Sequence, residues 1–201
     1  MRKARPERLP LIDADIRLWR EVDLGRSDQA LLGELIDASQ WRQDRITVYG
    51  KPYLQPRLSA WFGDVSYRYS GLTLHPLPWT ATLLELKGRV EALTDHDYNS
   101  VLLNYYRDQH DSMGMHCDDE RELGPQPAIA SLSLGEQREL LLKHKTRKDL
   151  KSYRLPLPPG SLLLMCGQTQ IHWRHGIAKC KQVCGPRINL TFRKIFPGKR
   201  P

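Results

Sequence analysis

The chain has 201 residues, of which 40% are hydrophobic and 27% are charged, and its mean hydropathy is −0.55. This composition is typical of a globular protein with one domain. The 31 Lys and Arg residues exceed the 23 Asp and Glu residues, and the resulting formal charge of +8 favours a polyanionic partner such as nucleic acid. The longest apolar run, Leu162–Cys166, is far shorter than the roughly 20 residues of a membrane-spanning helix, so we expect no membrane insertion.

Residues 1–8 are basic and polar and lead into no apolar stretch, which predicts a flexible basic tail rather than a secretory signal. The cysteines are too few and too irregularly spaced for a disulfide framework. Cys180 and Cys184 lie four residues apart, but no second pair with zinc spacing follows, so we interpret them as ordinary thiols. Free thiols suit a reducing compartment. We therefore expect a cytoplasmic protein, in the bacterial cytoplasm or nucleoid, or in the nucleus of a eukaryote.

The first half of the chain predicts helices and a hairpin. Ser27 is suited to cap a helix through about residue 40, in which apolar residues recur on one face. Residues 46–49 followed by Gly50, Lys51 and a proline predict a hairpin turn. A second helix is expected after Pro78.

After residue 97 the pattern changes to apolar, strand-like runs separated by loops, at residues 101–106, 129–134, 139–143, 161–166 and 187–196. Many strands without intervening helices indicate an all-β sandwich or barrel. We expect an N-terminal extension over residues 9–97 and a β core over residues 98–201, integrated into one domain.

The sequence His116-Cys-Asp118 is the first chemical signal. Residues i and i+2 of a strand point to the same face, so the imidazole and the carboxylate are expected to converge. A distant second histidine would complete the two-His, one-carboxylate set that binds non-haem Fe(II). Both His172 and His175 are available, and spacing alone does not choose between them. The remaining histidines have no comparable partner and are interpreted as surface residues: His75, His96, His110 and His144.

Polar and apolar residues alternate strictly between Arg187 and Arg193. If this segment is a strand, one face carries Ile188, Leu190 and Phe192 and the other carries two arginines with an Asn and a Thr between them. Arginines inside a β core require anions to pair with. The same alternation is also typical of the solvent face of an edge strand. The polar pair Asn104 and Tyr106, on a strand that runs toward His116, favours the interior interpretation.

Taken together, these motifs resemble the AlkB family of Fe(II)/2-oxoglutarate dioxygenases, and most of all the branch that contains human AlkB homologues two and three. The resemblance covers roughly residues 45–196 and rests on the order of Asn104-x-Tyr106, His116-x-Asp118, His175 and Arg187-x-Asn189-x-Thr191-x-Arg193. It implies an α+β, mainly β fold, with a double-stranded β-helix (jelly-roll) core, N-terminal helices and a substrate-recognition hairpin region.

The resemblance also implies roles for individual residues. The Fe(II) ligands and catalytic residues would be His116, Asp118 and His175, because the family branch places the distal histidine twelve positions before the first arginine. Arg187 would pair with the distal carboxylate of 2-oxoglutarate. Arg193 would lie near the carboxylate that binds iron. The same co-substrate would be contacted by Asn104, Tyr106, Asn189 and Thr191.

For the substrate, the resemblance implies that Tyr69 stacks on a flipped base, beside Tyr67 and Arg68, and that Asp119 contacts the exocyclic amino group of the base. Residues at the predicted hairpin tip would enter the duplex: Tyr49, Gly50 and Lys51. A basic segment at residues 143–154 is a candidate for backbone contact, although such runs are usually solvated loops.

The implied function is oxidative demethylation of 1-methyladenine and 3-methylcytosine, a direct reversal of DNA damage that uses Fe(II), 2-oxoglutarate and O2 and releases formaldehyde, succinate and CO2. The expected partner is DNA with alkylated bases, or RNA, bound by a monomer. One alternative is the same chemistry on RNA, on a protein or on a small molecule. Others are a non-catalytic nucleic-acid-binding module and a cupin-like isomerase. The intact triad argues against the binding module, and the paired arginines argue against the cupin.

Overall fold

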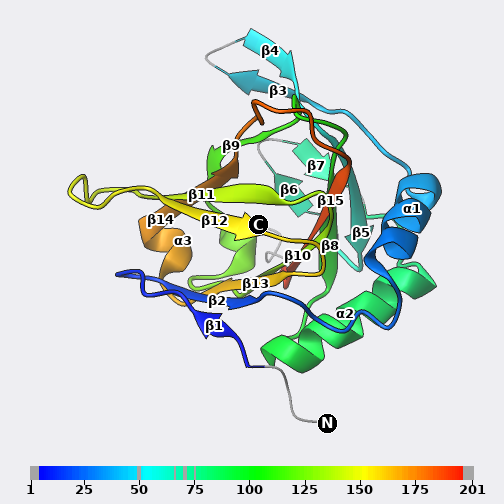
Figure 1. The fold of residues 1–201 in the computed structure, drawn as a ribbon, viewed down its shortest axis with the longest axis horizontal. Coiled ribbons are helices and arrows are strands. Elements are labelled where there is room, and N and C mark those ends of the chain that lie inside the picture. The colour runs from blue at the N-terminus through cyan, green and yellow to red at the C-terminus, as the bar shows by residue number, and fades with distance from the viewer. Residues whose placement is uncertain (1–4, 49–50, 66, 70–71, 75, 197–201) are drawn as a thin grey trace, which may run out of the picture.

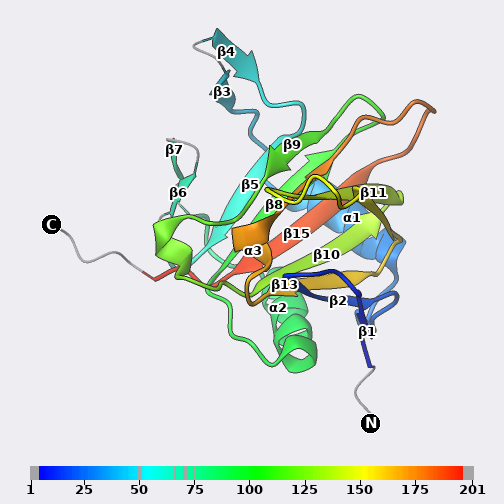
Figure 2. The same cartoon turned by 90° about the vertical axis from the view of Figure 1, so that its left-hand side faces the viewer.

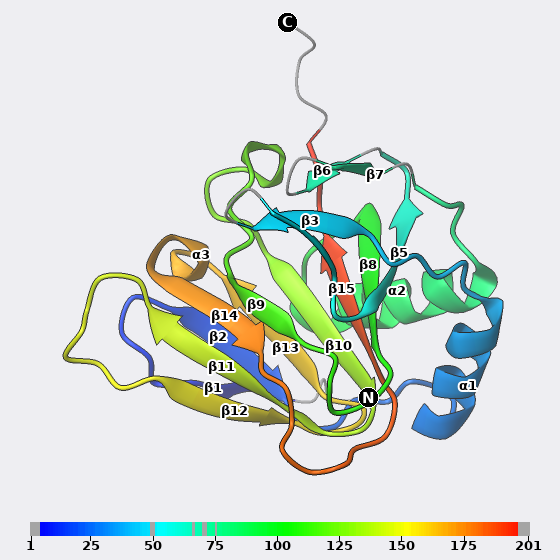
Figure 3. The same cartoon turned by 90° about the horizontal axis from the view of Figure 1, so that it is seen from above.

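A computed structural model describes residues 5–48, 51–65, 67–69, 72–74 and 76–196. Two antiparallel sheets face each other (Figures 1 and 3). The larger sheet contains, in spatial order, β1 (Glu7–Arg8), β2 (Asp15–Trp19), β13 (Leu162–Cys166), β10 (Ile129–Gly135), β15 (Arg187–Arg193), β8 (Ser100–Tyr106) and β5 (Leu58–Gly63). The smaller sheet contains β12 (Tyr153–Leu157), β11 (Arg138–His144), β14 (Trp173–Ile177) and β9 (Met113–His116). This arrangement confirms the predicted mainly β, jelly-roll fold.

Two helices cover the outer face of the larger sheet, on the side away from the smaller sheet (Figure 1). They are α1 (Asp28–Ala38) and α2 (Ala81–Thr94). The Ser27 side chain accepts a hydrogen bond from the Ala30 amide, and Thr80 caps α2 in the same way, so the helices begin where capping residues interrupt the extended chain. Both predicted helices are confirmed, although the first ends at Ala38 rather than at residue 40.

Apolar and polar side chains alternate along β15, so one face of the strand packs toward the helices and the other faces the space between the two sheets. Ile188, Leu190 and Phe192 are completely buried in the cluster between the larger sheet and the helices. The opposite face of the same strand turns toward the smaller sheet and carries the arginines. Since β15 is an inner strand, paired with β10 and β8, its alternation distinguishes two buried faces and not a buried face from solvent. The edge-strand alternative is therefore wrong.

The N-terminal half contributes directly to the larger sheet. Glu7 and Arg8 were predicted to belong to a flexible tail, but they pair with Leu18 and Arg17 of β2, because the exposed edge of β2 offers free backbone hydrogen-bonding groups. Strand β5 closes the opposite edge. Strands from before residue 98 thus complete the sheet that carries the site.

Two hairpins extend from the β5 side of the larger sheet (Figure 2). The first pairs β3 (Arg45–Val48) with β4 (Lys51–Leu54), which confirms the predicted pairing around residues 46–52; its turn, Tyr49 and Gly50, lies outside the described residues. The second pairs β6 (Tyr67–Tyr69) with β7 (Leu72–Leu74). The short helices η1 (Arg121–Leu123) and α3 (Thr169–His172) lie in the loops around the site.

Gly135, at the end of β10, is opposite Arg187 in the sheet and has a φ of +80°. A Cβ at this position would lie 2.4 Å from the carbonyl oxygen of Pro186. We therefore expect Gly135→Ala to lower the free energy of unfolding by at least about 2 kcal/mol, since both the backbone conformation and the space oppose a side chain.

Gly88 in α2 is a matched control, because a Cβ there meets no atom within 4 Å. Gly88→Ala should stabilise the protein by about 0.5–1 kcal/mol. Denaturant unfolding of both variants measures the difference. Equal stability of the two variants would contradict the steric argument.

Candidate metal and co-substrate site

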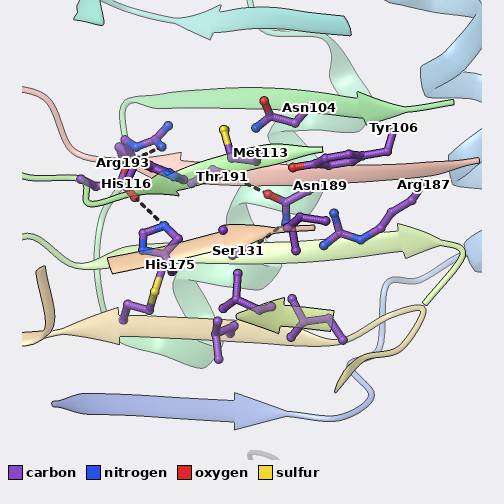
Figure 4. A pocket seen from close by; sticks show the side chains of 17 residues that line it. Asn104, Tyr106, Met113, His116, Ser131, His175, Arg187, Asn189, Thr191 and Arg193 are labelled. Carbon is purple, nitrogen blue, oxygen red and sulfur yellow. Dashed lines mark hydrogen bonds and ion pairs between the residues drawn. The ribbon is translucent and has the colours of Figure 1, made fainter. Parts of the chain in front are cut away.

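A cavity lies between the two sheets, with about 460 Å³ of space not filled by atoms and partly open to solvent. Figure 4 shows its polar side chains, which come from β8, β9, β10, β14 and β15. Each predicted metal-binding and co-substrate residue lines this cavity: Asn104, Tyr106, His116, Asp118, His175, Arg187, Asn189, Thr191 and Arg193.

Three potential metal ligands converge at one end of the cavity. His116 ends β9 and is paired in register with His175 of β14, so their ring centroids are 4.3 Å apart. The Asp118 Oδ2 atom is 3.7 Å from the His175 Nε2 atom. One ligand atom from each of the three residues lies within 4.8 Å of the others. The predicted triad is therefore brought together, with His175 as its distal histidine.

The local explanation for the His-x-Asp pair was wrong. Strand β9 ends at His116, so Asp118 lies in the following loop and not on the same strand face. The loop is held by other groups. The Asp118 amide donates to the Gln170 Oε1 atom of α3 at 3.0 Å, and the Arg193 guanidinium donates to Asp118 Oδ1 at 2.7 Å. These two bonds fix the carboxylate so that its Oδ2 atom accepts no hydrogen bond from the described residues.

The charges of the triad suit a divalent cation. Burial lowers the pKa of the His175 ring to about 3, helped by the neighbouring His116, so His175 is neutral and can coordinate. Burial alone would raise the pKa of the Asp118 carboxyl, but Arg193 and the two histidines hold it at about 2. The His116 Nδ1 atom donates to the Gly114 carbonyl oxygen at 2.9 Å, which leaves its Nε2 atom as the ligand. Two imidazoles and one carboxylate, with one carboxylate oxygen open, fit Fe(II).

His172 belongs to a different group, with Asp13 and His144. The His144 Nδ1 atom accepts a hydrogen bond from the Arg147 amide at 3.0 Å, so its Nε2 atom carries the proton and faces Asp13 Oδ2 at 3.4 Å. A protonated ring nitrogen has no lone pair for a metal, and we interpret this group as structural. His144 was predicted to be a surface residue, and that prediction was wrong: it is 5% exposed and packs edge-on against Trp173. His96 and His110 are exposed as predicted; His75 lies outside the described residues.

Arg187 lies in the cavity wall with its charge buried. Its side chain is 1% exposed, and its Nη2 atom donates to the Ser133 hydroxyl at 3.0 Å. The Nε and Nη1 atoms find no acceptor among the described residues. Burial lowers the pKa of Arg187 to about 10, while the nearby Tyr106 opposes the shift. Unused donors on a buried guanidinium fit an incoming anion such as a carboxylate.

The other predicted co-substrate residues are linked by hydrogen bonds along the cavity wall. The Asn189 side chain donates to the Ser131 hydroxyl at 2.7 Å, and the Thr191 hydroxyl donates to the Asn189 Oδ1 atom at 2.9 Å. Asn104 accepts a bond of 2.7 Å from Arg57, which is 4% exposed. The co-substrate face is thus organised before any ligand is bound.

Sequence reasoning missed several residues of this site: Arg57, Met113, Ser131, Ser133, Arg138 and Gln170. Ser131 and Ser133 have the two-residue period of the neighbouring β15 positions, so the alternation in residues 129–134 was a usable signal. Arg57 is part of the family resemblance, as Pro56-Arg57, but the sequence assigned it no role, and Gln170 had no signal, because the contacts of both join segments far apart in the chain.

Among the predicted substrate residues, Asp119 is exposed at the rim beside Asp118. Its Oδ2 atom accepts from the Cys117 thiol at 3.1 Å and from Lys145 at 3.3 Å. Lys51 is exposed in β4. Tyr67, Arg68 and Tyr69 form β6, but their side chains lie outside the described part of the structure, as do Tyr49 and Gly50.

Residues 143–154, which we call the basic loop, join β11 to β12 and extend from the smaller sheet (Figure 1). Most of its cationic side chains are exposed: Lys143, Arg147, Lys148, Lys151 and Arg154. Arg147 pairs with Asp149 and Arg154 pairs with Glu139, whereas Lys145 turns inward to the Gln170 carbonyl oxygen and to Asp119. No helix in the described part of the chain is long and apolar enough to span a membrane.

Comparisons with known proteins agree with this geometry. A family model described as the 2OG-Fe(II) oxygenase superfamily matches residues 25–193. The chain is 40% identical over 187 residues to alpha-ketoglutarate-dependent dioxygenase alkB homolog 3 of Mus musculus, covering 89% of this chain and 65% of that protein. It is 43% identical over 164 residues to DNA oxidative demethylase ALKBH2 of Mus musculus, covering 78% of this chain and 69% of that protein.

The same identity, 43% over 164 residues, is found with ALKBH2 of Homo sapiens, covering 78% of this chain and 63% of that protein. The chain therefore spans only about two thirds of the length of these relatives. A solved structure of OsALKBH1 superimposes with a TM-score of 0.65 at 15% sequence identity, covering 94% of this chain and 99% of that one. At that identity the likeness shows a shared fold.

The two histidine groups predict opposite effects of mutation. His175→Ala should abolish stoichiometric binding of Mn(II), a redox-silent substitute for Fe(II), because it removes one of three ligands. His172→Ala should bind Mn(II) with nearly unchanged affinity, since its ring stacks on His144 and lies in the other group. Calorimetric titration measures both. Loss of binding in His172→Ala with retention in His175→Ala would reverse the ligand assignment.

Proposed function

The chain belongs to the AlkB family of the 2OG-Fe(II) oxygenase superfamily, and we propose that it removes alkyl groups from nucleic-acid bases by oxidation. Family membership makes Fe(II) its metal and 2-oxoglutarate and O2 its co-substrates. The observation that carries the proposal is the combination, in one cavity, of a His116–Asp118–His175 triad, whose Asp118 and His175 are buried, and a buried Arg187 with unused donors. Such a cavity can hold a metal and an anion side by side.

His116, Asp118 and His175 would hold the metal, and the Arg187 guanidinium, which has donors without an acceptor among the described residues, would bind the far carboxylate of 2-oxoglutarate. Together, the bound metal, 2-oxoglutarate and O2 supply an oxidation that yields succinate and CO2 and converts an N-methyl group into one that leaves as formaldehyde. The protein's own contribution is orientation. The Arg193–Asp118 bond occupies one carboxylate oxygen and would leave the other for the metal, and apolar side chains form part of the cavity wall.

We propose DNA with 1-methyladenine or 3-methylcytosine as the substrate, bound by a monomer. The names of relatives with 43% identity, which are DNA oxidative demethylases, support this substrate. A base inside a duplex must be flipped out to reach a buried site, and methylation of its pairing edge lowers the cost of flipping. The same chemistry on RNA is the second candidate, and the exposed basic loop suits either nucleic acid. A cytoplasmic location, or a nuclear one in a eukaryote, would accompany either substrate.

Residues 9–97 would supply the nucleotide-recognition region. Both hairpins of this segment extend from the β5 side of the sheet, as Figures 2 and 3 show. We propose that Tyr67, Arg68 and Tyr69 contact the flipped base and that Tyr49, Gly50 and Lys51 contact the duplex. Asp119, exposed beside the metal ligands, would accept a hydrogen bond from the amino group of the base.

A substrate panel tests the proposed function. Oligonucleotides with 1-methyladenine or 3-methylcytosine, as single- and double-stranded DNA and RNA, are incubated with the Fe(II)-loaded protein, 2-oxoglutarate and O2. We expect formaldehyde and repaired base in equal amounts from DNA, and neither from Asp118→Ala. Turnover on RNA alone would favour the second candidate. Succinate release without repair of any oligonucleotide would contradict the nucleic-acid substrate.

The basic loop predicts a change in the salt dependence of binding. In Lys148→Gln/Lys151→Gln, two exposed cations are lost, so the slope of log K against log salt concentration should fall by about 1–2. Fluorescence anisotropy with labelled DNA measures the slope. The matched control, Arg20→Gln/Lys87→Gln, removes two charges just after β2 and on α2, and its slope should be unchanged. Equal slopes in the two double variants would exclude the loop from the interface.

A further inference from the structure

Arg138, at the start of β11, is a second buried cation beside the cavity, and the proposed function leaves it without a role. Its side chain is 2% exposed. Its Nη2 atom donates to the carbonyl oxygens of Asp111 at 2.9 Å and Ala178 at 2.7 Å, and its Nη1 atom donates to that of Asp108 at 3.3 Å. One guanidinium therefore joins the loop after β8 to the loop after β14, whose strands carry Tyr106 and His175.

Arg138 and Arg187 share the ring of Tyr106. The central carbon of the Arg138 guanidinium is 5.5 Å from the ring centroid, and that of Arg187 is 5.2 Å from the same point. Each guanidinium is attracted to the ring, and their common contact places two like charges close together. The proximity of Arg138 acts with burial to lower the pKa of Arg187.

These two charges have no carboxylate in direct contact. Neither Arg138 nor Arg187 forms an ion pair within the described part of the chain. Asp111 is the acidic residue whose loop contacts Arg138, but both of its carboxylate oxygens are bonded to Arg107, at 2.8 and 2.9 Å. Carbonyl oxygens satisfy the donors of Arg138, and the Asp111 carboxylate, which it shares with Arg107, interacts with Arg138 only through space. A buried cation without an anion is costly, and an incoming carboxylate recovers that cost.

We propose that Arg138 is a positioning and selectivity residue for the co-substrate: it fixes Tyr106 and Arg187 at one end of the cavity and adds the second positive charge that favours a 2-oxo acid with a distal carboxylate. This inference rests on the assignment of 2-oxoglutarate to the cavity and extends it. A 2-oxo acid that lacks the distal carboxylate gains nothing from Arg138. Arg138 thus changes the ratio of affinities for 2-oxo acids with and without a distal carboxylate, in addition to any effect on the stability of the fold.

The test measures binding, without nucleic acid and without turnover. The Mn(II)-loaded protein is titrated by calorimetry with 2-oxoglutarate and with 2-oxovalerate, which has the same carbon chain but no distal carboxylate. Arg138→Gln removes the charge and retains a donor for the carbonyl oxygens. We expect it to lower the ratio of the two affinities on the order of tenfold, through weaker binding of 2-oxoglutarate alone. Arg138→Lys restores the charge and should recover most of the ratio.

Arg20→Gln is the matched control, because it removes an exposed arginine charge near β2 and should leave the ratio unchanged. Thermal unfolding verifies that each variant is folded. If Arg138→Gln does not fold, the test uses Arg138→Lys, which must keep the wild-type ratio of affinities for 2-oxoglutarate and 2-oxovalerate. An unchanged ratio in folded Arg138→Gln, or a ratio lost equally in Arg138→Lys, would overturn the proposal. Failure of the wild-type protein to bind 2-oxoglutarate would instead overturn the co-substrate assignment itself.

Discussion

The burial of the Asp118 charge is the constraint on which the rest of the site depends. Its side chain is 1% exposed, and a lone carboxylate in such a position would take up a proton and lose its value as a ligand. Arg193 prevents this, because its guanidinium pairs with Asp118 Oδ1 and keeps the pKa near 2. The bond also joins the loop after β9 to the end of β15. One ion pair therefore sets both the charge of the proposed metal ligand and the position of the segment that carries it.

Strand β15 transmits this constraint to the end of the cavity where we propose that 2-oxoglutarate binds. Arg193 and Arg187 occupy the two ends of the same strand, on the same face, so the proposed metal and carboxylate positions are separated by a fixed length of regular backbone. A shift of one residue in the pairing would place both arginines among the helices and Leu190 in the cavity. Burial of the apolar face of β15 therefore fixes the pairing register of the strand, and with it the positions of the polar side chains on the opposite face.

The sequence predicted the parts of the site whose signal is local. The alternation around Asn189 predicted a strand with two distinct faces, and the family resemblance selected His175, which the structure places with His116 and Asp118. The reason given for Asp118 failed, since its position depends on a hydrogen bond that its amide donates to Gln170, 52 residues away. Strand propensity carries no information about contacts between loops that only the folded chain brings together. The burial of His144 and of Arg138 escaped sequence reasoning for the same reason.

The net charge is distributed in a way that the composition conceals. Among the described residues, the buried ionised groups other than His are four arginines, Arg57, Arg138, Arg187 and Arg193, and two carboxylates, Asp111 and Asp118. The positive excess in this set lies around the cavity and is out of reach of a polyanion in solvent. Part of the +8 charge thus favours a small anionic co-substrate, and the remainder, including the exposed basic loop, is available to nucleic acid. The positive charge of the chain thus serves two different proposed ligands. The burial of each arginine shows which of the two ligands it can reach.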